Sequence, residues 1–547
     1  MATLLIAARP GLAQVENVPV SNQVYGFLDR MAVKGILPLY NNTMIPLSRR
    51  EVGDLLMNIE QKKDRLNGTE FDFLQKFHRE FAHEIDPAGE DPAVITRGVS
   101  PGDLVSDKEK YLYVYGDSTV TSYVELLGAL EYRTASGNSY NNGNPHVSME
   151  EHGGRIRGTL KNRLGYFLQG TDGTIFGDKE FALTDRRLSG NYKLRLPGST
   201  NFDFTEAYLR ADLSWFNLEF GKERVLVGTG YGDRLLLSDN APTFDLIKLD
   251  AQYKSLRFLF VHGSLVADST VFPGIEVDEP AGSNKYFTLH RLQLSLFDRL
   301  NLGVSEMTIY QRFSPEFAYL NPINFYKSAE HALHDRDNSF LTFDLEIFPV
   351  NSYKLYGTWL IDDIDFSKFG TGWWGNEFGW QGGIFAADLA GLPNVDGILE
   401  YTRIEPFVYS NRVAGNDYTH SSMNLGSHLD PNSDEWLIQL NYTPSRRLRT
   451  SLAYSDTRHG ENIVVNPGEI RNIGGSILQG HRSTDSDLAT FLDGNLDRSH
   501  RIQVHAIYEP ITDLFIIGTY EYSQTRFVTT DELTSDRYAS IRVQLGY

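Results

Sequence analysis

The chain has 547 residues, of which 41% are apolar and 12% aromatic, with 48 Gly and no Cys. The absence of Cys excludes disulfide-stapled folds and thiolate metal sites. A net charge of -20 excludes a general nucleic-acid binder, because phosphates must be neutralised by clustered Lys and Arg. No uninterrupted apolar run reaches about 18 residues, so a helical membrane protein is also excluded. A β-barrel is not, because half of each strand can be polar.

Residues 1–14 are predicted to be a secretory signal peptide, shortened by a mis-assigned or trimmed start. The run 4–8 is apolar, and the small residues Gly11 and Ala13 follow it in the pattern that precedes a signal-peptidase cut near Ala13 or Gln14. An ordinary disordered N-terminus is the alternative.

Residues 15–95 are predicted to form a small helical bundle. Ser48 and Glu51 form a capping box that begins the second helix, and Thr69 is predicted to cap the third. The third helix carries an apolar stripe with spacings of three and four, which needs a partner surface. Its members are Phe73, Leu74, Phe77 and Phe81. Residues 96–118 are predicted to be a linker.

Residues 119–547 alternate between apolar and polar side chains, as half-buried strands do. In one example, Ala207, Leu209 and Ala211 oppose Glu206, Tyr208 and Arg210. A soluble sandwich would turn the apolar face to a core. A membrane barrel would turn it to lipid and the polar face to a lumen.

Loop lengths favour the barrel. Tight turns alternate with long polar segments such as 225–242, 312–338 and 460–497, as short periplasmic turns alternate with long external loops in outer-membrane barrels. The fold class predicted is an all-β transmembrane barrel of about 18 antiparallel strands. The expected strand starts are residues 120, 146, 163, 203, 215, 243, 255, 285, 299, 339, 352, 379, 395, 434, 446, 498, 511 and 536.

Charged side chains of both signs are predicted to face the lumen, which suggests a cross-linked network rather than a selective ring. Whether the lumen conducts depends on how loops and helices block it. The side chains are Glu125, Glu131, Arg133, Glu206, Arg210, Asp212, Arg291 and Arg542.

The last strand, 538–547, places Val543, Leu545 and Tyr547 on one apolar face and ends in an aromatic residue. This resembles the C-terminal assembly signal of outer-membrane proteins. The expected partners are therefore the barrel assembly machinery, outer-membrane lipid and lipopolysaccharide.

Enzyme motifs are missing. The sequence contains no G-x-S-x-G, H-E-x-x-H or Walker A pattern. The run 335–338 offers oxygen ligands but lacks the Gly and distal Glu of a calcium loop. We predict no enzyme, no cofactor and no metal. A barrel lipase stays open, because its catalytic residues would meet only in space.

Aromatic residues mixed with amides are the positive signal, because aromatic rings stack on sugar C–H faces while amides bind hydroxyls. The alternative is the aromatic girdle, in which Trp and Tyr mark the membrane interface. An isolated residue such as Trp215 fits the girdle better. The glycan-binding residues predicted in loops 312–338 and 363–380 are Trp373, Trp374, Tyr319, Asn321, Asn324, Asp337 and Asn338.

The segment 220–249 resembles the Wzi-type capsule assembly proteins, with a Gly-rich loop followed by a Leu-rich S-x-N-A-P-x-F run. Further similarity lies in NPINFY at 321–326 and EYTRIEPFVYSN at 400–411. The matching positions in the first segment, interpreted as structural, are Gly221, Lys222, Gly228, Gly230, Ser238, Asn240, Pro242 and Phe244.

The resemblance implies an eighteen-stranded outer-membrane barrel, with its helical bundle in the periplasm, that holds capsular polysaccharide at the cell surface. Two other functions stay open. A wide barrel conducts by default, so a porin or export channel for solutes or glycans is the main alternative. A barrel enzyme acting on lipid or glycan is the third.

Overall fold

A computed structural model describes residues 14–38, 40–85, 92–117, 119–140, 143–267, 283–334 and 336–547. Apart from Gln14, the predicted signal peptide lies outside the described residues. No helix in the described part of the chain combines the length and the apolar composition needed to cross a bilayer.

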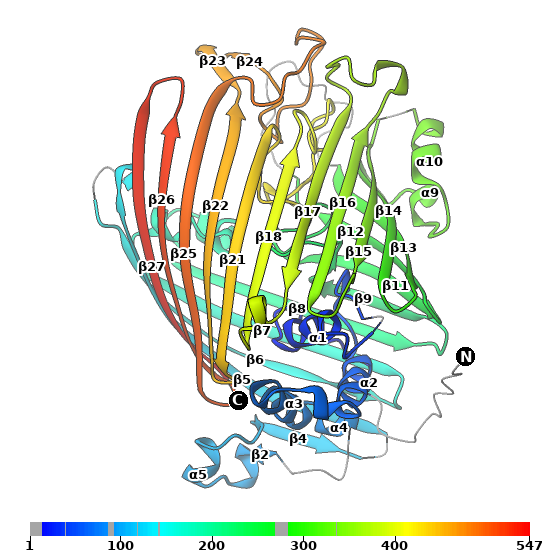
Figure 1. Cartoon of the computed structure of the whole chain (residues 1–547), viewed down its shortest axis with the longest axis vertical. Coiled ribbons are helices and arrows are strands. Elements are labelled where there is room, and N and C mark those ends of the chain that lie inside the picture. The colour runs from blue at the N-terminus through cyan, green and yellow to red at the C-terminus, as the bar shows by residue number, and fades with distance from the viewer. Residues whose placement is uncertain are drawn as a thin grey trace.

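Eighteen antiparallel strands form a closed barrel, which confirms the predicted fold class (Figure 1). β5 and β27 close it, with Arg542 opposite Glu131. Each predicted strand start lies within four residues of an observed one. The strands are β5 Val120–Gly137, β6 His146–Leu160, β7 Leu164–Gly177, β8 Asn201–Asp212, β9 Asn217–Glu223, β11 Phe244–Tyr253, β12 Leu256–Leu265, β13 Asn284–Leu296, β14 Leu300–Arg312, β15 Asn338–Ile347, β16 Tyr353–Asp363, β17 Glu377–Ala386, β18 Val395–Ile404, β21 Ser433–Ser445, β22 Leu448–Glu461, β25 Asn495–Ile511, β26 Leu514–Phe527 and β27 Glu532–Gly546.

The two ends of the barrel differ. Eight connections of two to eight residues gather at one end, whereas the connection between β22 and β25 at the other end has 33 residues. Along most of the barrel the outward side chains are apolar and exposed and the inward ones are polar; the wall around β12–β14 differs, with an apolar core on its inner side. On β5, for example, Leu130 is 63% exposed and Glu131 is 9% exposed. The alternation therefore separates a lipid-facing surface from a polar lumen.

The N-terminal helices are α1 Val24–Val33, α2 Arg49–Glu60, α3 Gly68–Glu80 and α4 Ala82–Ile85. Ser48 and Glu51 form the predicted capping box. The predicted cap of the third helix at Thr69 is wrong. Asn67 caps it instead, because its side chain accepts from the Glu70 backbone N–H while the Glu70 carboxylate accepts from that of Asn67. The predicted stripe of α3 is buried.

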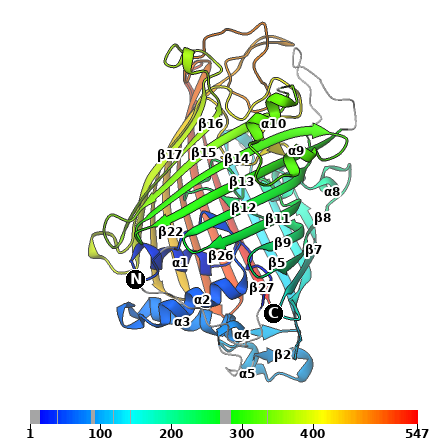
Figure 2. The same ribbon diagram turned by 90° about the vertical axis from the view of Figure 1, so that its right-hand side faces the viewer.

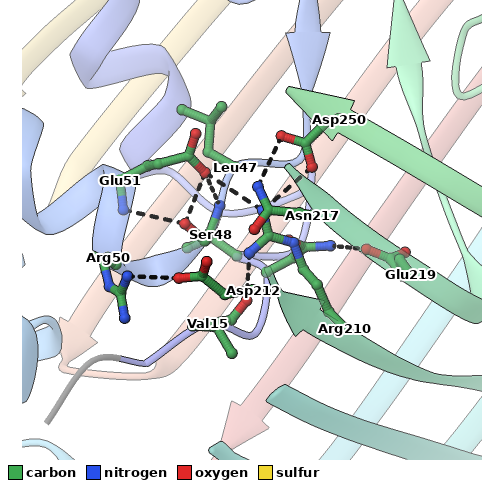
Figure 3. Close-up of polar contacts among 12 residues, drawn as sticks. Val15, Leu47, Ser48, Arg50, Glu51, Arg210, Asp212, Asn217, Glu219 and Asp250 are labelled. Carbon is green, nitrogen blue, oxygen red and sulfur yellow. Dashed lines mark hydrogen bonds and ion pairs between the residues drawn. The ribbon is translucent and has the colours of Figure 1, made fainter. Parts of the chain in front are cut away.

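The helical bundle lies at the short-turn end of the barrel (Figure 1). Its apolar faces pack on one another and on Phe348, Phe385 and Ile398 of the barrel. Figure 3 shows the N-terminal segment around Val15 and α2 against β8, where Arg210 donates to the Val15 carbonyl at 2.8 Å and Arg50 pairs with Asp212 at 2.8 Å. The bundle is therefore bonded to the barrel.

The segment 224–243 between β9 and β11 folds into the lumen, although the sequence predicts an external loop. Inside, β10 Leu226–Val227 pairs with β1 Met44–Ile45 of the N-terminal region. Leu235, Leu236 and Leu237 are fully buried in an apolar core against the inner wall. Three consecutive leucines need such a core, which the external solvent does not offer.

The remaining elements are short and belong to the linker and the loops. They are α5 Pro101–Leu104, α6 Lys179–Ala182, α7 Arg186–Ser189, α8 Tyr192–Arg195, α9 Phe317–Leu320 and α10 Tyr326–Ala332; β2 Ala93–Val94, β3 Lys110–Tyr111, β4 Tyr113–Gly116, β19 Thr419–His420, β20 Met423–Asn424, β23 Ile463–Asn466 and β24 Glu469–Arg471; and 3-10 turns at Lys63–Arg65, Ile95–Arg97, Asn138–Tyr140, Phe366–Lys368 and Leu389–Gly391.

Candidate functional site

The Trp373–Trp374 loop, between β16 and β17, docks on the loop between β22 and β25. The Trp374 ring stacks on His481 with centroids 3.7 Å apart, and its backbone N–H donates to the Asp487 carbonyl at 3.1 Å. Trp373 forms an isolated bridge with Leu488, and its ring lies 3.8 Å from the Lys368 ammonium. Both Trp side chains are half-buried. The structure thus brings two distant loops together at the long-loop end.

Beside this contact lies a cavity of about 400 Å³, which we call the outer cavity. Phe407 contributes an aromatic face, and its ring also contacts Trp374 at 5.8 Å. The volume is in the range of sites that hold small ligands. The other lining residues are Gly468, Glu469, Ile470, Arg471, Asn472, Ile473, Arg482, Thr484, Asp485, Ser486, Leu488, Ala489, Thr490 and Asp493.

The outer cavity has no excess of positive charge. Arg482 is bonded to Asp485 at 2.7 Å, and Arg471 pairs with Asp493 at 2.9 Å. Glu469 adds a further carboxylate, so the lining offers no excess cation. Hydroxyl, amide and backbone groups beside an aromatic face suit an uncharged polyol. No local motif marks this site; its walls come from the connection between β22 and β25, and only Phe407 comes from another loop.

The other predicted binding residues have structural partners. Tyr319 is fully buried, and its hydroxyl donates to Asp337 at 2.6 Å. The Asn338 amide donates to the carbonyl of Asn416 at 3.0 Å, and that of Asn324 to Ala318 at 3.0 Å. Asn321 is exposed.

The predicted binding residues of the loop 312–338 do not share the contacts of Trp373 and Trp374. Asp337 is buried and pairs with Arg312 at 3.0 Å. Asp335, the first residue of the run 335–338 considered as a calcium loop, lies outside the described residues. Trp380 is not in the Trp373–Trp374 loop. It lies on β17, faces outward and stacks on Trp359 at 5.2 Å, as girdle residues do.

The lumen is occupied where the inward segment crosses it. The backbone N–H groups of Tyr231 and Gly232 donate to the Glu400 carboxylate at 2.8 and 3.1 Å. Gly230 has a φ of 137°, and a Cβ there would lie 1.9 Å from the Asp233 carbonyl. Only glycine therefore fits this crossing.

The other predicted motif positions share this setting. Phe244 packs edge to face on Phe287 at 5.0 Å, and the Asn240 amide donates to the Asn424 carbonyl at 2.8 Å. β9 carries Gly221 and Lys222, and β11 begins with Phe244. The segment 224–243, which folds into the lumen, carries Gly228, Ser238, Asn240 and Pro242.

His428 ties the inward segment to the loop between β18 and β21. Its Nδ1 lies 2.8 Å from Asp233, and its Nε2 lies 3.5 Å from Glu435. Burial alone would lower the pKa of His428, but the two carboxylates outweigh burial and raise that pKa to about 9. The imidazolium is therefore the form present at neutral pH.

We expect His428→Gln to destabilise the protein at pH 6 by up to about 3 kcal/mol, from the difference between the folded pKa and the ordinary one of about 6.5. A raised folded pKa contributes stability that is complete below the ordinary pKa and is lost as the pH rises through 9. Denaturant unfolding in detergent should therefore show that the difference in unfolding free energy between the wild type and His428→Gln disappears by pH 10. The control His146→Gln, at an exposed position, should change little at either pH. A difference in unfolding free energy that grew as the pH rose would contradict the conclusion that His428 is charged in the folded protein.

The family model of capsule assembly protein Wzi matches residues 131–538. The structure of Wzi from Escherichia coli, described as a carbohydrate-binding β-barrel involved in group 1 capsule assembly, has 13% identity and a TM-score of 0.57. The match covers 98% of this chain and 99% of that one.

A BenF-like porin from Pseudomonas fluorescens Pf-5 has 11% identity and a TM-score of 0.45, over 78% of this chain and 99% of that one. The search of curated proteins finds no match. The match to the family model spans most of the barrel, and the solved Wzi structure shares its fold. The chain therefore belongs to the family of capsule assembly protein Wzi.

Proposed function

We propose that this protein is an outer-membrane lectin that holds a surface polysaccharide at its outer cavity, with Trp373 and Trp374 beside it. The observation that carries the proposal is the docking of the Trp loop on the walls of a polar cavity with an aromatic face. Family membership and the description of E. coli Wzi as carbohydrate-binding support it. The lining has three carboxylates and two guanidinium groups, which favours a neutral sugar residue over an anionic one.

A solute channel is less supported. The inward segment crosses the lumen, and the N-terminal bundle lies across the short-turn end. A catalytic role is not proposed, because His481, which precedes the cavity residue Arg482, is held by the Trp374 ring and by the Ser486 carbonyl.

We expect replacement of Trp373 and Trp374 together by Ala to release glycan into the medium without lowering barrel abundance. Each aromatic contact with the glycan contributes about 1 kcal/mol, so loss of both tryptophans should weaken glycan binding roughly tenfold or more. Retention also depends on many copies per cell. The direct measurement is binding of the detergent-solubilised protein to a glycan array. Trp436→Ala, at a lipid-facing position, is the control.

Because Trp374 also supports its neighbour loop, a second variant isolates the cavity. Thr484→Trp fills the outer cavity and leaves both tryptophans in place, and it should abolish glycan binding. Val465→Trp adds the same ring on β23, outside the cavity lining, and should bind normally. Full glycan retention by both test variants, with normal insertion, would sink the proposed site.

We also propose that the helical bundle faces the periplasm, since it lies at the short-turn end of the barrel. In intact cells a protease added outside should leave residues 20–85 uncut, and permeabilising the outer membrane should expose them. Cleavage of this region in unbroken cells would refute the topology.

A further inference from the structure

The outer wall of the barrel has a polar patch near the long-loop end of β12–β14. Residues pointing outward there include His262, Thr288, Glu306 and Thr308, and all are buried. Their neighbours along the strands point inward into the apolar core, among them Leu289 and Met307. Uncovered polar groups on a lipid-facing wall would be costly.

The segment 313–334, which carries α9 and α10, covers this patch; we call it the strap. Figure 2 shows α9 and α10 over the outer face of β13 and β14. Thr288 donates to the Tyr319 carbonyl at 2.9 Å, and the Glu306 carboxylate accepts from the backbone N–H groups of Tyr326 and Lys327 at 2.9 and 2.7 Å. The Tyr326 ring stacks on His290 at 4.4 Å. The strap thus supplies polar partners that lipid lacks.

Four large apolar side chains are exposed on the strap, beside the exposed polar residues Ser314, Asn321, Ser328, His331 and His334. Phe317 is 86% exposed, Ile323 81%, Phe325 77% and Phe313 65%. The lipid-facing surface continues below the patch on the same wall, where Leu292 and Val304 are exposed. A cluster of large exposed apolar side chains marks an interaction surface, and this one adjoins the surface that faces lipid.

We propose that the strap is seated in the outer leaflet, with acyl chains of the membrane packed on Phe313, Phe317, Ile323 and Phe325. One side of the strap then satisfies the polar wall, and the other extends the apolar belt of the barrel. This inference does not depend on glycan binding. It places the predicted residues Tyr319 and Asn324 in a membrane-anchoring element.

The chain contains no Cys, so single-cysteine variants take a nitroxide label at one position only. Ile323→Cys and Phe325→Cys are labelled in the full-length protein, in vesicles of dimyristoylphosphatidylcholine. Collision with oxygen, which concentrates among acyl chains, is compared with collision with a water-soluble nickel chelate. Leu292→Cys on the lipid-facing wall is the membrane control, and Val464→Cys on β23 is the water control.

We expect the oxygen-to-nickel ratio at positions 323 and 325 to match that at 292 and to exceed that at 464 severalfold. Heat-modifiable migration confirms folding of each variant, and either strap position alone suffices. Ratios equal to that at 464 would show the strap in water and overturn the proposal. Spin–spin broadening that disappears on dilution with unlabelled protein would show a second copy on the strap, and would overturn it too.

Discussion

Replacing Val543 and Leu545 together by Asp will abolish assembly of the barrel. β27 closes the barrel because it pairs with β26 over fourteen residue pairs and also with β5, the first barrel strand. When the barrel closes in the membrane, the outward side chains of β27 must contact lipid. Val543 lies on that face and is 38% exposed. Each carboxylate would cost less than the about 2–4 kcal/mol that a cation costs at the bilayer midplane, and the cost falls toward the interfaces. The measurement is the loss of the heat-modifiable, folded band from the outer-membrane fraction.

The matched control places the same two charges on the other face of the same strand. Ser540 lies opposite Arg133 of β5, and Gln544 lines water-accessible cavities of the lumen. Ser540→Asp with Gln544→Asp should therefore assemble. Normal surface levels of the lipid-face double variant would mean that the apolar face of β27 does not meet lipid.

The strands can be located from the sequence because two signals agree at each of them. The alternation on β8, for instance, sets both its position and its inward face, and the tight turn after Asp212 fixes its end. The inward charges Arg210 and Arg291 were placed correctly for the same reason. Arg291 is 1% exposed and is bonded to Asp344 on β15, a pairing that no local pattern reveals.

Loops escaped prediction because their direction depends on partners far along the chain. Nothing local states that the segment 224–243 turns inward, although its three leucines show that it needs a core. Nothing local states that Tyr319 faces the outer wall. Aromatic residues beside amides are equally suited to packing and to sugar binding, and only the contacts of each loop separate the two. Trp374 and Tyr319 therefore looked alike in sequence and differ in the folded chain.

The second large effect concerns the bond between the helical bundle and the barrel. Lys354 of β16 lies between Asp29 of α1 at 2.8 Å and Glu346 of β15 at 3.4 Å. The exposed fractions of the three side chains are 1%, 5% and 1%. Lys354→Met keeps much of the length but leaves two buried carboxylates without their cation. Removing one partner of such a pair costs about 3–5 kcal/mol.

We expect this loss in the free energy of unfolding, together with higher conductance in planar bilayers, because α1 then loses one of its ion pairs with the wall and keeps those of Arg30. Lys63→Met is the control: its pair with Glu60 is at the surface, with Lys63 52% exposed, and should be worth about 0–1 kcal/mol. Adding Asp29→Asn to Lys354→Met removes one orphaned charge and should restore part of the stability. If Lys354→Met were as stable and as closed as the control, this ion pair would not hold the bundle, and its apolar contacts and its other polar bonds to the barrel would be sufficient.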